Sequence, residues 1–223
     1  VSYRDGKASR MKYAGGKHIL DELEITDTDE PNGTLVHWKP DDAIFTDTNI
    51  PSRWLRDLCK KVSYVSGFTV TYTHNDKSEV YEGKSLEQEM LDSVEYAVGS
   101  TNMVHMVDNE GDLCVCEAEV ILGSSGRGSE YFHNKVEVRG GVHSTSFNTA
   151  VAVFFDGLRG EYNIRFKETD YAGKISIISS TLSNKMSVRG QTKDYVDDQF
   201  IYICLYDCIL NMLKQEYAKG TPW

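Results

Sequence analysis

Hydrophobic and polar residues follow two periods along this chain, one typical of helices and one typical of strands. Apolar residues at helical spacing predict four helices, over residues 51–65, 85–98, 143–157 and 197–217. The first of these rests on one apolar stripe, made by Trp54, Leu55, Leu58 and Val62. Strand-like runs rich in β-branched and aromatic residues cover 1–13, 33–40, 67–74, 102–107, 112–122, 129–138 and 173–182. Helices and mostly consecutive strands together predict an α+β fold.

Turn and cap residues support these boundaries. Asp5-Gly6 supplies the positive φ angles that a tight hairpin needs, so residues 1–13 are expected to fold as a strand pair. Ser85 precedes the second predicted helix and is a suitable N-cap. No internal repeat or long linker interrupts the pattern.

Length and composition limit the class of protein. The 223 residues, 40% of them hydrophobic, are enough for one large domain or two modest ones with a real core. No apolar run approaches the ~18 residues of a membrane span, and no secretory leader is recognisable. The sequence starts without Met inside a strand pair, which predicts a piece of a longer chain. Five cysteines without framework spacing predict a reducing, cytoplasmic location.

The net charge of −10 is unevenly distributed. Residues 1–122 hold 12 Lys and Arg against 23 Asp and Glu, whereas residues 123–193 hold 10 against 6. An acidic chain is a poor general binder of polyanions, because affinity for DNA comes mainly from neutralised phosphates. The basic middle segment is compatible with a face toward nucleic acid or a nucleotide, and equally with a mixed surface.

A polar tripeptide, Gln191-Thr192-Lys193, stands between a strand-rich region and the last predicted helix. In one interpretation Thr192 or Asp194 caps that helix and Lys193 is a solvated charge. In the other, Gln191 and Lys193 project from a loop and hold an anion such as a phosphate. The tripeptide by itself leaves both interpretations open.

Other combinations of reactive residues are weak as sites. Two cysteine pairs lie on one face of a strand or a helix, namely Cys114 with Cys116 and Cys204 with Cys208. They lack the paired spacing of a zinc site, so buried free thiols and no bound metal are expected. The glycines around Arg127 predict a hairpin turn, since no strand-to-helix junction follows them. His143-Ser144 lacks the context of a nucleophile elbow.

Five ordered segments carry a resemblance to a known family. They are "YRDGKASRMKYAGGKHILDELEITDTDEPNGTLVHWKPDDAIF", "WLRDLCKKVSYVSGFTVTY", "YEGKSLEQEM", "FHNKVEVRGGVHSTSF" and "GKISIISSTLSNKMSVRGQTKDYV". In order and spacing they resemble the B subunit of bacterial type II topoisomerases, gyrase and topoisomerase IV. The chain departs from the family at "GGVH", where the family has "GGTH", and at "YAGK", where it has "REGL". The segment around residues 157–167 looks shorter than the corresponding segment of the family. These departures leave gyrase, topoisomerase IV and a phage or mobile-element relative indistinguishable.

The resemblance implies two modules and a nucleotide sensor. Residues 1–80 resemble the C-terminal portion of a GHKL-type ATPase domain, and residues 81–223 the transducer domain, which is related to domain 2 of ribosomal protein S5. By this resemblance Gln191 and Lys193 contact the γ-phosphate of ATP. Thr34 corresponds to the threonine of the adenine pocket.

The resemblance also implies a function for the whole protein, an ATP-hydrolysing DNA topoisomerase that couples ATP to strand passage. ATP and Mg²⁺ would be its cofactors, and its partners would be DNA, the A subunit and a second B subunit, in the cytoplasm with the nucleoid and without a membrane. The DNA-facing candidates are Arg127, Arg139, Arg165 and Lys167. The family motifs with the general base and the magnesium ligand are missing here, so the chain alone is predicted to be inactive and to hold no cofactor.

Two other classes remain open at this point. A different GHKL ATPase, such as a MutL-like mismatch-repair protein, shares the architecture. A non-enzymatic nucleic-acid-binding module could have kept only the S5-like fold.

Overall fold

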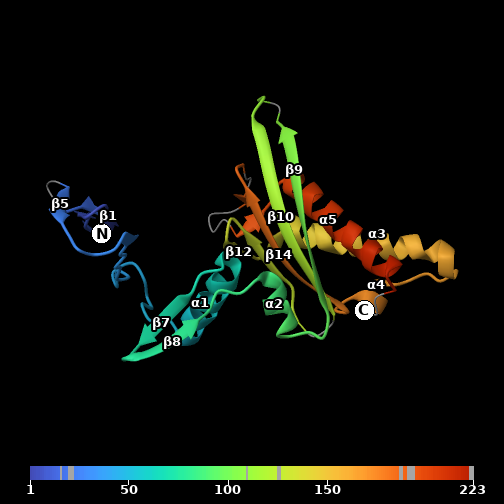
Figure 1. Cartoon of the computed structure of the whole chain (residues 1–223), viewed down its shortest axis with the longest axis horizontal. Coiled ribbons are helices and arrows are strands. Elements are labelled where there is room, and N and C mark those ends of the chain that lie inside the picture. Colours follow the sequence, from blue (N-terminus) through green and yellow to red (C-terminus); the bar gives the residue numbers. More distant parts are fainter. Residues whose placement is uncertain are drawn as a thin grey trace. The chain divides into compact units, whose positions relative to one another are not determined.

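The computed structural model divides the chain into two compact units, Val1–Pro51 and Ser52–Trp223. It describes residues 1–15, 17–19, 23–108, 110–124, 127–185, 188–189 and 194–220. Figure 1 labels the helices and many of the strands. In the described part of the chain, no helix is long and apolar enough to cross a membrane.

The first unit is built around a four-stranded sheet in the order β5-β2-β1-β6. Its strands are β1 (Ser2–Arg4), β2 (Lys7–Arg10), β5 (Glu24–Asp27) and β6 (Gly33–Thr34), and a short hairpin joins β3 (Tyr13–Ala14) to β4 (Lys17–His18). The predicted Asp5-Gly6 turn is confirmed, because both residues have positive φ angles.

The strand predicted over 33–40 is wrong for most of its length. Only Gly33 and Thr34 pair with β1. Beyond them, Leu35 N donates to Val1 O and the Val1 amino group donates to Leu35 O, both at 2.8 Å. Residues 35–40 form no strand. Val36 and Trp38 are accordingly exposed.

The second unit contains a five-stranded sheet in the order β12-β11-β14-β10-β9. Its strands are β9 (Ala97–Val107), β10 (Leu113–Ser124), β11 (Glu130–His133), β12 (Val136–Val138) and β14 (Ile175–Ser183). The run predicted as one strand over 129–138 is a hairpin, because Asn134 and Lys135 turn the chain with φ angles of 47° and 68°. β11 runs parallel to β14, and the other pairs in this sheet are antiparallel.

Two long helices cover one face of this sheet (Figure 1). They are α3 (Val142–Tyr162) and α5 (Gln199–Ala218). Alternate residues of β10, including Cys116, Ala118 and Val120, point to these helices and form the main core with them. α3 continues past Gly157, where the sequence predicted its end, and stops at Asn163, which adopts the left-handed conformation of a C-cap.

The opposite face of the sheet packs against α1 (Ser52–Ser66) and α2 (Leu86–Leu91). The hairpin of β7 (Val70–His74) and β8 (Lys77–Tyr81) lies between these helices in sequence. Ser85 caps α2 as predicted, since its side chain accepts from Gln88 N, but α2 ends seven residues earlier than expected. A second apolar cluster, distinct from the main core, consists of Tyr64, Val65, Leu86, Met90, Val94, Ile121, Phe132 and Ile178.

The apolar stripe predicted on α1 is only partly correct. Trp54 and Leu58 are 57% and 41% exposed, whereas Tyr64 and Val65 near the end of the helix are buried. Within this unit, α1 therefore packs through its C-terminal half. The four cysteines on the strand and helix faces are buried and free, as predicted.

Candidate functional site

The tripeptide Gln191-Thr192-Lys193 lies outside the described residues. The described strands on either side are β15 (Val188–Arg189) and β16 (Tyr195–Val196), which pair antiparallel. Residues 190–194 lie between these two strands in the sequence. β16 also pairs parallel with β13 (Gly140–Gly141), which completes a three-stranded sheet.

Two contacts attach the chain directly after Lys193 to the start of α3. Arg139 N donates to Asp194 O at 2.8 Å, and Arg139 Nε lies 3.0 Å from Asp194 Oδ2. Two residues on, Gly141 approaches β16 so closely that an added Cβ would lie 2.0 Å from Val196 O. Gly141 also has a φ of +75° and is the N-cap of α3. This position therefore requires glycine on two grounds.

On its other side, β16 leads directly into α5. Asp198 is the N-cap of α5, because its carboxylate accepts from Phe200 N at 3.0 Å. The interpretation in which Thr192 or Asp194 caps this helix is therefore wrong. Val196 and Phe200 are buried in the main core. Only a few residues separate Lys193 from the core-packed start of a 20-residue helix.

A chain of buried polar side chains lies beneath the start of α3. His143 is hydrogen-bonded through Nδ1 to Ser179 Oγ at 2.9 Å and through Nε2 to Thr181 Oγ1 at 3.1 Å. Thr181 Oγ1 also meets His133 Nδ1 at 2.7 Å. Burial lowers the pKa of His143 to about 3, with a smaller contribution from His133, and burial also lowers the pKa of His133. Both imidazoles are consequently neutral at pH 7.

This network is not a hydrolase site. Ser144, the neighbour of His143 in sequence, donates its hydroxyl to Gly141 O within the first turn of α3. The hydroxyls that His143 does contact come from β14 and are fully buried. Sequence reasoning missed these partners, because they follow His143 by more than 30 residues.

Arg127 does not face solvent as the sequence predicted. Its side chain is 12% exposed and binds two carboxylates, with 3.1 Å to Glu89 and 2.5 Å to Glu130. This correction removes Arg127 from the DNA-facing candidates, because a guanidinium already occupied by two acids is not available to phosphates.

The other basic candidates are exposed. The side chain of Arg139 is 85% exposed despite its ion pair with Asp194. Arg165 and Lys167 lie next to α4 (Glu168–Tyr171) on the surface. Lys167 begins α4, where its backbone N–H donates to Asp170 Oδ2 at 2.7 Å.

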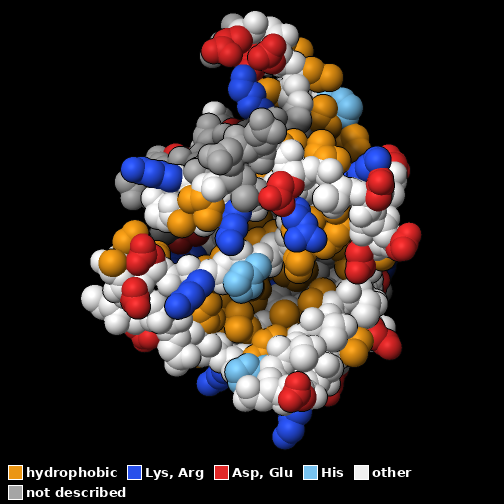
Figure 2. All heavy atoms as spheres, turned by 90° about the vertical axis from the view of Figure 1, so that its left-hand side faces the viewer, with side chains coloured by type: hydrophobic (Ala, Val, Ile, Leu, Met, Phe, Trp, Pro, Cys, Tyr) orange, Lys and Arg blue, Asp and Glu red, His pale blue; other side chains and the backbone are white. Residues whose placement is uncertain are grey.

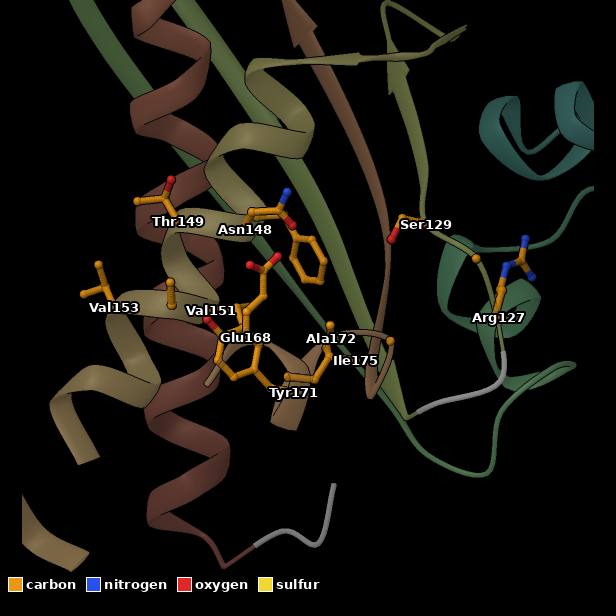
Figure 3. Close-up of a pocket in the computed structure, with 14 residues that line it drawn as sticks. Arg127, Ser129, Asn148, Thr149, Val151, Val153, Glu168, Tyr171, Ala172 and Ile175 are labelled. Atoms are coloured by element: carbon orange, nitrogen blue, oxygen red, sulfur yellow. The ribbon is translucent and has the colours of Figure 1, made fainter. Parts of the chain in front are cut away.

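A pocket of about 580 Å³ lies between α3 and α4. In Figure 3, Glu168 and Tyr171 extend from α4 toward α3, where Asn148 and Val151 form the facing wall. Arg127 lies apart from this wall and its guanidinium points away from it (Figure 3). The pocket thus combines apolar walls with one carboxylate, and it lacks the cluster of cations that a phosphate site needs.

The tip of the β9–β10 hairpin is acidic. Asp108, Glu110 and Asp112 bring their carboxylates within 4.8 Å of one another, and Lys185 forms an ion pair with Asp108. Red side chains gather at this tip at the top of Figure 2. Asp108 Oδ1 also accepts from the backbone N–H of Glu110 and Asp112, so local hydrogen bonds and a lysine already account for this cluster.

Thr34 lies in the first unit, on β6, where it pairs with Ser2. Its side chain is exposed. The structure of this unit alone therefore leaves its hydroxyl accessible to a ligand.

Several solved structures share the fold of this chain. The topoisomerase IV ATP-binding domain of Francisella tularensis matches 99% of this chain with a TM-score of 0.66 at 13% identity, over 63% of that chain. The structure of the DNA gyrase B subunit from Myxococcus xanthus matches 96% of this chain and 65% of its own chain, with a TM-score of 0.65 at 16% identity. The 43K ATPase domain of Thermus thermophilus gyrase B matches 98% with a TM-score of 0.63 at 15% identity, over 63% of that chain. The chain shares the α+β fold of these gyrase B and topoisomerase IV structures.

The sequence comparisons name the same group. The DNA gyrase B subunit of Thermotoga maritima is 23% identical over 236 residues, which cover 97% of this chain and 36% of that protein. The type 2 topoisomerase B subunit of Aquifex aeolicus is 23% identical over 229 residues, covering 97% of this chain and 29% of that protein. No protein-family model matches the chain. Over almost its whole length the chain is similar to B subunits of bacterial type II topoisomerases, and it spans well under half of the length of these two proteins.

Proposed function

We propose that this chain is part of the ATP-operated clamp of a type II DNA topoisomerase. In the whole protein it would couple ATP binding and hydrolysis to DNA strand passage, and thus to supercoiling or decatenation. The observation that carries the proposal is the similarity to gyrase B subunits over 97% of the chain, together with a shared fold over the same extent. A MutL-like ATPase and a non-enzymatic S5-like module are the alternatives.

Within this function, Gln191 and Lys193 sense the γ-phosphate. A lysine is a compact point charge that suits a terminal phosphate, and its contact is lost when that phosphate leaves. A loop that binds ATP but not ADP has the differential affinity that a conformational switch requires. The surroundings support this role, because Asp194 is attached to Arg139 and β16 continues into α5. A displacement of the loop would therefore reach both long helices.

The remaining assignments follow the same resemblance. Residues 1–80 would belong to the ATPase domain and residues 81–223 to the transducer, with Thr34 in the adenine pocket and ATP with Mg²⁺ bound in the whole protein. Arg139, Arg165 and Lys167 are the exposed cations available to DNA. The partners would be DNA, an A subunit and a second B subunit, and the location would be cytoplasmic, at the nucleoid.

The test is the ratio of affinities for a non-hydrolysable ATP analogue and ADP in the whole protein. Lys193→Ala should weaken the analogue about tenfold to a hundredfold, as expected for a charge-assisted hydrogen bond worth about 1.5–3 kcal/mol. Affinity for ADP should barely change. Lys214→Ala, at an exposed position on α5, is the control and should leave both affinities unchanged. An unaltered ratio in Lys193→Ala would show that Lys193 is an ordinary surface lysine.

A further inference from the structure

Glu89 on α2 is a buried carboxylate surrounded by three cations. Its side chain is 1% exposed. Oε1 lies 2.9 Å from Lys60 Nζ of α1 and 3.1 Å from a guanidinium nitrogen of Arg127. Oε2 has Lys84 Nζ at 3.7 Å and no hydrogen-bond partner among the described residues. A carboxylate in the interior needs such cations around it to be stable there.

Arg127 extends this cluster to a second carboxylate. It lies 2.5 Å from Glu130 Oε2, and the same oxygen accepts the hydroxyl of Tyr64 on α1 at 2.9 Å. Burial, followed by the charge of Glu130, raises the pKa of Tyr64, so this hydroxyl stays protonated and donates. α1 therefore reaches the cluster through two side chains, Lys60 and Tyr64.

If α1 detached from the sheet, its own charged side chains and those of α2 and the sheet would be left in different surroundings. Arg127 is 12% exposed and bridges both carboxylates, and Lys84, which pairs with Asp92, lies 3.7 Å from Glu89. Glu89 and Glu130 therefore keep cationic neighbours without α1. Lys60 is 51% exposed and can turn into water. α1 can thus detach without stranding a bare charge, which is the usual obstacle to opening a buried ion cluster.

The apolar contacts of α1 are too few to hold this helix firmly on the sheet by themselves. Its only buried apolar residues are Tyr64 and Val65, both in the second apolar cluster, and none of its residues belongs to the main core. Outside the cluster, Lys61 pairs with Glu137 at 2.7 Å, and Lys135 donates to Val65 O at 2.7 Å; both of these contacts involve exposed partners.

We propose that Glu89 is a positioning residue at an ionic latch, made by Lys60, Tyr64, Glu89, Arg127 and Glu130, that holds residues 52–81 on the sheet. When the latch opens, α1 and the β7–β8 hairpin separate as a unit while the sheet and its long helices stay folded. The latch rests on these contacts alone; only its position at the joint between the ATPase and transducer modules rests on the proposed function.

Hydrogen exchange of the 223-residue chain, measured by mass spectrometry without nucleotide, tests the latch. Glu89→Gln removes the charge that Lys60 and Arg127 share, with little change in shape. Exchange of the amides of α1 should become at least about tenfold faster, whereas exchange in β10 and β14 should stay as in the wild type. The matched control is Glu137→Gln, the same chemical change at a solvated partner of α1, which should leave α1 within about twofold of the wild type.

Lys60→Met gives a second, milder test, because it removes one of the two contacts of α1 with the cluster and keeps the pair of Arg127 with Glu89. It should accelerate exchange in α1 by a smaller factor, again without effect on β10, and it decides the question if Glu89→Gln does not fold. The proposal is overturned if α1 exchanges at the wild-type rate in the variants that fold. Equal acceleration of α1 and β10, or an equal effect of Glu137→Gln, would also overturn it.

Discussion

Gly141→Ala should strongly destabilise the second unit. Gly141 is the N-cap of α3 and pairs with Val196 on β16, the strand that follows Lys193 in the sequence. The residue has φ +75° and ψ −134°, a region open to glycine and costly for alanine by about 1–3 kcal/mol. The new Cβ would also lie 2.0 Å from Val196 O, a backbone atom that cannot turn aside. Separating β13 from β16 would lose hydrogen bonds worth about 1–2 kcal/mol more. The expected loss is therefore about 2–5 kcal/mol, a large part of the stability of an ordinary domain.

The assay is equilibrium unfolding in urea at pH 7, followed by circular dichroism. Gly157→Ala is the matched control, because Gly157 lies inside α3 and an added Cβ would meet no atom within 4 Å. This control should gain about 0.8–1 kcal/mol, the difference in helix propensity between the two residues. If Gly141→Ala unfolds within about 0.5 kcal/mol of the wild type, the close contact of β13 with β16 does not exist in solution, and the coupling of the loop to α3 fails with it.

Three further outcomes are expected. Burial lowers the pKa of His143 to about 3, so this imidazole stays neutral in the folded protein. The free energy of unfolding should therefore be highest above pH 6.5 and should fall by about 1.4 kcal/mol per pH unit between pH 6.5 and 5. His133, whose pKa burial also lowers, should add to this slope. Urea titrations at several pH values check this, and a flat profile would contradict it. DNA binding by the chain should be weak and should decrease steeply with salt in filter-binding assays, and Arg165→Ala with Lys167→Ala should reduce the salt slope by about 2; tight binding that is insensitive to salt would refute it. The 223-residue chain should show no ATPase activity above a buffer blank in a phosphate-release assay, so activity that persists through further purification would disprove the prediction.

The recognisable elements of this protein are local in origin. α1, α5, β10 and β14 follow from residue periodicity, because one buried face imposes its own spacing on a helix or a strand. The Asp5-Gly6 turn and the Ser85 cap follow from the chemistry of one or two residues. The ordered motifs were enough to identify the relatives, since a resemblance accumulates along the chain and needs no contacts.

Ends of elements depended on partners that are distant in sequence. The strand that begins at Gly33 ends at Thr34, the partner of Ser2 on β1, and the run after Ser129 divides at Asn134 because β12 folds back on β11. The helix cap near the tripeptide is Asp198, since the chain first pairs with β13 before it turns into α5. None of these choices is encoded within a short window, so periodicity misplaced them.

The roles of charged and polar side chains were decided by the tertiary structure. From the sequence alone, Arg127 is a basic residue in a glycine-rich turn; in the fold it is buried between Glu89 and Glu130. His143 similarly finds Ser179 and Thr181 on a strand that follows it by more than 30 residues. The sequence by itself determined the resemblance to type II topoisomerase B subunits, the α+β class and most elements, which depend on local pattern. Which charges are buried together, and hence which are free to act, is a property of long-range packing, because a charge is stable in the interior only beside partners that the fold brings to it.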